Sequence, residues 1–158
     1  MAAVERIKSV VSRIRWKSVF AVVLLVALAA VAFKWLPAGY QTGGGLGLRV
    51  SANPPKVAPG GLTTLEAELK NLDSDRSVKV LVKARTYDAE LVFEETYGQE
   101  YDGLPISIGP QGARKITFKI NSKPTALEGK YPVDVTAAEE GGGEGAAKRI
   151  FLTIEKKG

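Results

Sequence analysis

Residues 131–137 read YPVDVTA, and apolar side chains recur in this stretch at every second position. The apolar set is Tyr131, Val133, Val135 and Ala137, and the set between them is Pro132, Asp134 and Thr136. Because successive side chains of a β-strand point to opposite faces, this alternation is typical of a strand with one buried face. The stretch therefore predicts a sheet with a hydrophobic core on one side and solvent on the other.

Five more segments show the same alternation, and turn-forming residues separate them. The segments are 46–50, 65–69, 78–84, 116–120 and 150–154. Short apolar runs at 91–93 and 105–108 predict two further strands. Turns are indicated by clusters such as Asn53-Pro54-Pro55 and Gly109-Pro110-Gln111-Gly112. Short strands with regular turns predict an all-β, antiparallel β-sandwich of about seven strands.

Three motifs in the predicted sandwich point to a known family. The first combines Val50, Asn53-Pro54-Pro55 and Pro59-Gly60-Gly61 with a strand ending in Lys70-Asn71-Leu72. The others are the run 106–118 and the segment Gly129–Val135. Together they resemble bacterial and archaeal immunoglobulin-like surface domains related to the CARDB and NEW3 groups, over about residues 46–156. The resemblance implies an immunoglobulin-like fold and a role as a spacer, adhesion unit or assembly surface. It does not specify which of these roles applies, because such a fold alone does not define a function.

The charge of the chain is concentrated at one end. Residues 1–40 contain six basic residues and one acidic residue, whereas residues 41–158 contain sixteen of each sign. A domain without net charge is not expected to bind nucleic acid, which requires a basic surface. The chain has no Cys and no His, so disulfides, Cys/His zinc sites and Ser-His-Asp or Cys-His catalysis are excluded. We expect no catalytic residues, no cofactor, no metal ion and no small-molecule ligand.

An apolar segment precedes the predicted sandwich. The span from Trp16 to Leu36 contains 21 residues, which as a helix is about 31 Å long and matches the hydrocarbon core of a bilayer. Trp16 and Lys17 at one end, and Lys34 and Trp35 at the other, are predicted to lie at the two membrane interfaces. The basic residues before the span place the N-terminus in the cytoplasm by the positive-inside rule. This predicts a basic cytoplasmic segment (1–17), a transmembrane signal anchor (18–37), a Gly-rich linker (38–45) and an extracytoplasmic domain (46–158).

A cleaved secretory signal is the alternative interpretation of the same segment. Ala30-Val31-Ala32 matches a signal-peptidase pattern and would be cut before Phe33. Three features favour the anchor: the basic region before the apolar run is long, no helix breaker precedes the alanines, and the Lys and Trp residues continue beyond the predicted cut.

The candidate binding residues lie on the predicted strands and in one acidic segment. Leu81, Tyr87 and Phe151 occupy outward positions and would form a partner surface if the fold brings them together. Tyr97 and Tyr101 lie in the segment EETYGQEYDG (94–103), which is either a solvated connection or a surface for a cation or a basic partner. Tyr131 is either a core aromatic residue or a tyrosine corner, in which the hydroxyl bonds to the loop backbone.

These observations lead to one functional hypothesis and one alternative. The hypothesis is a non-catalytic, single-pass membrane protein whose outward domain binds other membrane or envelope proteins, either as an accessory subunit of a membrane complex or as an envelope-anchoring module. The alternative is a secreted immunoglobulin-like module that binds a carbohydrate or protein ligand after cleavage near Ala32.

Overall fold

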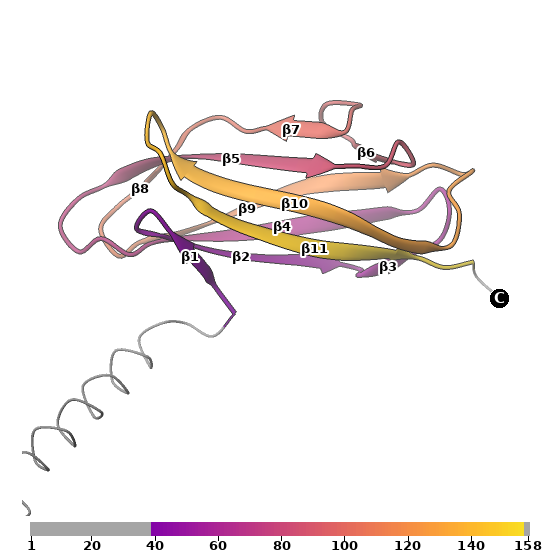
Figure 1. The fold of residues 1–158 in the computed structure, drawn as a ribbon, viewed down its shortest axis with the longest axis horizontal. Helices are drawn as coiled ribbons and strands as arrows, with labels where there is room; N and C mark the ends of the chain where they lie inside the picture. Colours follow the sequence, from indigo (N-terminus) through magenta and orange to yellow (C-terminus); the bar gives the residue numbers. More distant parts are fainter. Residues whose placement is uncertain (1–38, 157–158) are drawn as a thin grey trace, which may run out of the picture. The chain divides into compact units, whose positions relative to one another are not determined.

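The computed structural model describes residues 39–156, and these residues form a two-layered β-sandwich (Figure 1). The first sheet contains, in spatial order, β1 (Gln41–Gly43), β2 (Leu46–Asn53), β4 (Leu62–Asn71), β9 (Ala113–Ser122) and β6 (Leu91–Phe93). The second sheet contains β3 (Lys56–Val57), β11 (Ala146–Ile154), β10 (Gly129–Glu139), β5 (Val78–Thr86) and β7 (Glu100–Asp102), and β8 (Ile106–Ile108) also pairs with β5. The all-β sandwich is thus confirmed.

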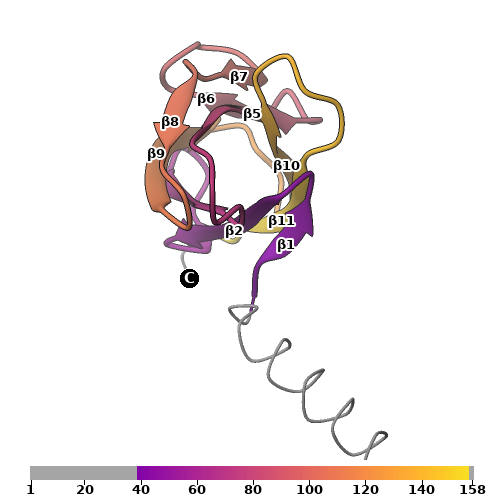
Figure 2. The same ribbon diagram turned by 90° about the vertical axis from the view of Figure 1, so that its left-hand side faces the viewer.

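The core lies between the two sheets and consists of the apolar residues that alternate in the sequence. Leu48 of β2, Leu65 of β4 and Val133 of β10 are completely buried. Their strands run antiparallel to their main neighbours. Because successive side chains alternate between the two faces of a sheet, the residues between these core positions face outward. Figure 2 shows the two sheets from one end, with the strands on either side of this core.

All eight predicted strands are present, and the structure adds three short ones. The six long strands extend beyond the predicted segments by one or more residues. The added strands are β1, β3 and β7, so the expectation of about seven strands is too low. Each of these three has only two or three residues, which is too short for an alternating pattern to be recognised.

The segment expected to be a flexible linker contributes to the sheet. Residues 41–43 form β1 and pair with Gly47 and its neighbours on β2, and the compact unit of the chain begins at Gly39. Gly44 and Gly45 adopt positive φ angles in the tight turn between β1 and β2. The glycines that suggested a flexible spacer are therefore required by a hairpin turn.

The predicted transmembrane helix, and with it Trp16, Lys17, Lys34 and Trp35, lies outside the described residues. Within residues 39–156, no helix is long and apolar enough to span a membrane.

Tyr131 forms a tyrosine corner. Its ring is buried and its hydroxyl donates a hydrogen bond of 2.7 Å to the carbonyl oxygen of Leu127, in the loop before β10. The ring therefore belongs to the core while the hydroxyl fixes the loop that enters the strand.

Removing this hydroxyl tests the corner. We expect Tyr131→Phe to lower the free energy of unfolding by about 1 kcal/mol, because the Leu127 carbonyl loses a protein partner. The measurement is urea unfolding of the full chain in detergent, followed by circular dichroism. The matched control is Tyr97→Phe, since Tyr97 is 87% exposed and forms no side-chain hydrogen bond among the described residues. An equal effect of the two variants would contradict the corner.

Candidate functional site on strands β5, β10 and β11

The outer face of the second sheet carries two exposed aromatic rings in one row. Pro132 of β10 pairs with Phe151 of β11, and Tyr87 follows directly after β5, whose last pair with β10 is Thr86–Val133. Tyr87 and Phe151 therefore flank Pro132 from either side. They are 53% and 57% exposed, and about 10 Å apart because two strand spacings separate them.

Proline fits this position in a central strand for a local reason. The ladder between β10 and β5 ends at Val133, so the missing N–H of Pro132 removes no bond to β5. Its ring fills the surface between the two aromatic side chains instead.

A charged row crosses the same strands next to the aromatic row. The register aligns Glu100 of β7, Arg85 of β5, Asp134 of β10 and Arg149 of β11 across the sheet. Arg149 donates two hydrogen bonds to Asp134, at 2.6 and 2.7 Å, and Arg85 lies 3.3 Å from Glu100. The charges alternate in sign along the row, which is the favourable arrangement for cross-strand pairs.

Tyr87 is held in place by this charged row. Its hydroxyl donates a 2.7 Å hydrogen bond to Asp134, and the guanidinium groups of Arg85 and Arg149 lie 5.2 and 5.6 Å from its ring centre. A ring with these three contacts has little rotamer freedom left to lose when a partner binds.

The hydrogen bonds also determine the protonation of the row. The hydrogen bonds from Arg149 lower the pKa of the Asp134 carboxyl, and the hydrogen bond from Tyr87 lowers it to a smaller extent. The partial burial of Asp134 acts in the opposite direction. The same pair raises the pKa of Arg149. Both groups are therefore ionised over the whole physiological pH range, and neither is poised to transfer a proton.

A shallow hollow of about 320 Å³ opens beside the charged row. Its lining residues are Lys83, Ala84, Arg85, Tyr87, Glu100, Asp102, Asp134 and Thr136. The hollow and the aromatic row together form one continuous outer face of β5, β10 and β11, which we call the aromatic face.

The structure brings only part of the predicted binding set together. Tyr87 and Phe151 share a row, but Leu81 lies six residues before Tyr87 on β5, which corresponds to about 20 Å along a strand. Tyr97 is exposed in the turn between β6 and β7, at a φ of 52°. Of the five candidate residues, the fold thus brings Tyr87 and Phe151 together and places Leu81 and Tyr97 elsewhere.

Tyr101, the second tyrosine of the acidic segment, points inward. It pairs with Ala84, whose side chain is buried, so the register points Tyr101 toward the core. Its ring stacks on Phe118 at 5.0 Å and packs near Phe93 at 6.1 Å. The two flanking residues of the three-residue strand, Glu100 and Asp102, point outward.

The carboxylates of the acidic segment are paired with cations or backbone amides. Glu94 pairs with Lys119 at 3.2 Å, and Glu95 accepts a 2.9 Å hydrogen bond from the backbone N–H of Lys119. Asp102 pairs with Lys83 at 3.1 Å. Among residues 39–156, no three acidic side chains converge as metal ligands would. The segment is thus built as a connection held by β5 and β9.

Sequence reasoning missed Arg85, Pro132, Asp134 and Arg149. The alternation placed them on outward positions of their strands, which is the one signal that the sequence offered. Their convergence on Tyr87 depends on the register between β5, β10 and β11, which is a tertiary property.

Comparison with known proteins gives a fold but no assigned family. No protein-family model and no curated protein sequence matches the chain. Among solved structures, a CARDB domain from Pyrococcus furiosus, determined in complex with di-metal ions, superposes with a TM-score of 0.51 at 21% identity and covers 71% of this chain and 94% of that one. A FixG-related protein from Vibrio parahaemolyticus has a TM-score of 0.51 at 8% identity, with 70% and 97% covered.

A third structure shows the same architecture inside a much larger protein. Escherichia coli alpha-2-macroglobulin superposes with a TM-score of 0.57 at 12% identity, over 71% of this chain and 7% of that one. Residues 39–156 therefore form an immunoglobulin-like β domain. Within that class, the fold is similar to the CARDB domain, in agreement with the resemblance in the sequence.

Proposed function

We propose that the protein is a non-catalytic, single-pass membrane protein whose extracytoplasmic immunoglobulin-like domain binds another membrane or envelope protein. In this proposal it acts as an accessory subunit of a membrane complex or as an envelope-anchoring module. The aromatic face carries the proposal, because it presents exposed, preorganised aromatic and Arg side chains.

The chemistry of this face suits a protein partner. Tyr and Arg are enriched among the residues that dominate binding energy in protein interfaces. Tyr87 offers a ring fixed by three contacts, and Phe151 offers a second apolar surface about 10 Å away. The surrounding ion pairs can form a polar rim around this centre.

Other side chains that could carry chemistry have structural partners. The hydroxyl of Thr86 donates to the carbonyl of Leu91 at 3.1 Å, and that of Ser122 donates to the carbonyl of Ala58 at 2.9 Å. No buried side-chain nitrogen or oxygen atom in residues 39–156 lacks a hydrogen-bond partner. These pairings favour a binding function over a catalytic one.

The membrane part of the proposal rests on the sequence of residues 1–37. Fractionation of cells into soluble and membrane parts, together with the intact mass of the mature chain, tests it. We expect the chain in the membrane fraction with a mass that begins at Met1. A soluble chain that begins at Phe33 would overturn the anchor and favour the secreted alternative, which the Ala30-Val31-Ala32 motif supports.

The binding part is tested with the full chain, purified in mild detergent with the partner that accompanies it. Once that partner is identified, we expect Tyr87→Ala and Phe151→Ala each to weaken its binding by about tenfold or more, because truncation of an interface anchor typically costs more than 1 kcal/mol. Leu104→Ala is the matched control, since Leu104 is 86% exposed and lies outside the aromatic face. Equal binding of all three variants would reject the aromatic face as the interface.

A further inference from the structure

The outer face of the first sheet carries a cluster of cations at the end where the described chain begins. Arg49 of β2, Glu68 of β4 and Lys115 of β9 form one row across the sheet. Lys70 lies in the next row, between the small residues Gly47 and Ala113. A hollow of about 370 Å³ opens over this region, lined by Arg49, Glu68, Ala113, Arg114 and Lys115.

The positive charge of this region is not balanced locally. Glu68 pairs with Arg49, and Glu66 pairs with Lys115 at 2.6 Å. Within residues 39–156, Lys70 and Arg114 form no ion pair with any carboxylate. Arg114 pairs with the buried Leu69, so the register turns it away from the row of Arg49 and Lys115, although it still lines the hollow. Four cations and two carboxylates thus surround the hollow and the rows beside it, although the domain as a whole is neutral. The excess creates a positive potential that attracts an anion.

The cluster is joined directly to the start of the domain. The ring of Tyr40 lies 5.4 Å from the guanidinium group of Arg49, and Tyr40 also forms a hydrogen bond with Glu68. Burial, followed by this hydrogen bond, raises the pKa of Tyr40 to about 12. Tyr40 therefore stays protonated and neutral, and it adds no negative charge that would offset the cations.

The length of the chain limits the distance between this cluster and the proposed membrane span. The span ends at Pro37, and three residues of extended chain reach Tyr40, a distance of about 10 Å at most. This is comparable to the Debye length of about 8 Å at physiological ionic strength. With the anchor of the proposed function, cations at this position would experience the field of an anionic membrane surface.

We propose that the hollow, together with Lys70, binds the phosphate groups of anionic lipid headgroups in the leaflet through which the chain emerges. Arg49 and Arg114 supply planar guanidinium groups that suit phosphate oxygens, and Lys70 and Lys115 supply point charges. The contact would orient the domain on the membrane and leave the aromatic face, which lies on the other sheet, open to a partner. This inference rests on the membrane anchor of the proposed function.

The experiment uses the full chain and exploits its lack of cysteine. Thr117, an exposed residue two positions after Lys115 on β9, is changed to Cys and labelled with a nitroxide. The chain is reconstituted into vesicles of phosphatidylcholine, with or without phosphatidylglycerol, that carry a nickel-chelating lipid. Relaxation of the nitroxide by headgroup nickel reports how closely this face approaches the membrane.

We expect stronger relaxation in vesicles that contain phosphatidylglycerol, and we expect high salt to remove the difference. The double variant Lys70→Gln/Arg114→Gln should reduce the population in contact with headgroups by at least about fivefold, since each basic residue near an anionic surface contributes roughly that factor. Arg114 is exposed, Lys70 is half-buried on the outer face, and neither forms an ion pair within residues 39–156, so the variant is expected to fold normally.

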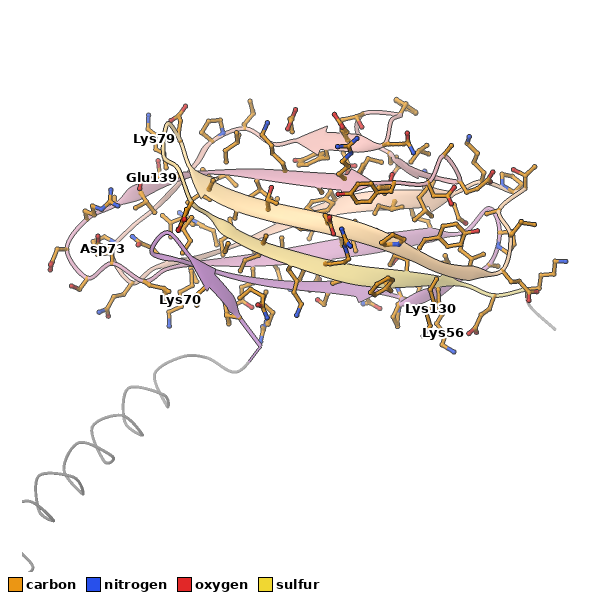
Figure 3. All side chains as sticks on the ribbon, in the orientation of Figure 1. Lys56, Lys70, Asp73, Lys79, Lys130 and Glu139 are labelled. Carbon is orange, nitrogen blue, oxygen red and sulfur yellow. The ribbon has the colours of Figure 1, made fainter. Side chains whose placement is uncertain are left out.

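The matched control is Lys56→Gln/Lys130→Gln. Figure 3 shows Lys56 and Lys130 at the end of the sandwich opposite to Lys70, and both flank Thr153 on the second sheet. This control should behave like the unmodified chain. Relaxation that does not depend on phosphatidylglycerol, or an equal loss in the two double variants, would overturn the inference.

Two further outcomes separate the sources of the result. If relaxation does not depend on phosphatidylglycerol, while inorganic phosphate changes the nitroxide spectrum at a concentration where chloride of equal ionic strength does not, the hollow is a site for small anions and the lipid assignment is wrong. If alkaline carbonate extracts the chain from the vesicles, the anchor and therefore the proposed function fail. A chain that resists extraction but shows no lipid dependence overturns only this inference.

Discussion

Asn71→Ala is expected to lower the free energy of unfolding by about 3 kcal/mol, because the change leaves several buried backbone groups without partners. Asn71 is fully buried at the end of β4. Its amide nitrogen donates to the carbonyls of Arg76 at 2.8 Å and Gly109 at 3.0 Å, and its oxygen accepts from the backbone N–H of Asp73 at 3.0 Å. One side chain thus joins the β4–β5 loop to the turn between β8 and β9.

The size of the effect follows from what surrounds this amide. The loop between β4 and β5 begins with two turns stabilised by side chains, in which Asn71 and then Asp73 accept hydrogen bonds from backbone amides two residues later. The bonds from Asp75 and Arg76 also lower the pKa of Asp73. Without the Asn71 side chain, the first of these two turns loses its buried hydrogen-bond acceptor. The exposed carboxylate of Asp73, which stabilises the second turn, cannot replace it.

Thermal unfolding of the full chain in detergent, followed by circular dichroism, measures the change. A loss of about 3 kcal/mol corresponds to a fall in midpoint of roughly 10 °C for a domain of this size. Both tryptophans lie in residues 1–38, so tryptophan fluorescence would not report on the domain.

Two variants show whether the hydrogen bonds are the cause. Asn121→Ala removes the same atoms from a half-exposed position on β9 that forms no side-chain hydrogen bond within the described residues, and it should change stability by less than about 0.5 kcal/mol. Asn71→Asp keeps the shape but turns the two donors into a carboxylate that faces carbonyl oxygens, so it should be at least as destabilising as Asn71→Ala. A mild effect of Asn71→Asp would show that volume, and not hydrogen bonding, determines the role of this residue.

Gly145→Ala is expected to lower the free energy of unfolding by about 2–3 kcal/mol through a steric conflict in the β10–β11 hairpin. A Cβ atom at Gly145 would lie less than 3.0 Å from the carbonyl oxygen of Ala137 and from the Cα atom of Ala138. Both belong to β10, which is held by β11 on one side and β5 on the other. Because β11 and β5 hold the backbone of β10 on both sides, it cannot shift to relieve the conflict without a cost in free energy.

The same hairpin provides a control, Gly143, two positions before Gly145. Gly143 has no atom within 4 Å of a Cβ built on it, and its φ is not in the positive region. Gly143→Ala should therefore leave stability unchanged or raise it by about 0.4–1 kcal/mol, since alanine restricts the unfolded chain more than glycine does. Equal unfolding midpoints for the two variants would contradict the close approach at Gly145.

The alternating pattern alone was sufficient for the main features of the domain. Every long strand lies where apolar residues recur at every second position, and the inward set of YPVDVTA is buried as predicted, from Tyr131 at 8% exposure to Val133, Val135 and Ala137 at 0%. This works because the side-chain period of a strand is a local property of the chain. The lack of Cys and His, and the charge imbalance between residues 1–40 and 41–158, are likewise read directly from the sequence.

The sites required the tertiary structure, because they depend on register and on contacts between distant segments. Tyr87 and Phe151 are 64 residues apart in the sequence, and only the pairing of β5, β10 and β11 places them on either side of Pro132. The cation cluster likewise needs β2, β4 and β9 side by side before Arg49, Lys70 and Lys115 can be recognised as a group. A shift of one residue in any of these ladders would turn the same side chains to the opposite face. The sequence by itself thus determined which residues form strands and which of them face inward, and the long-range pairing of those strands decided which outward residues act together.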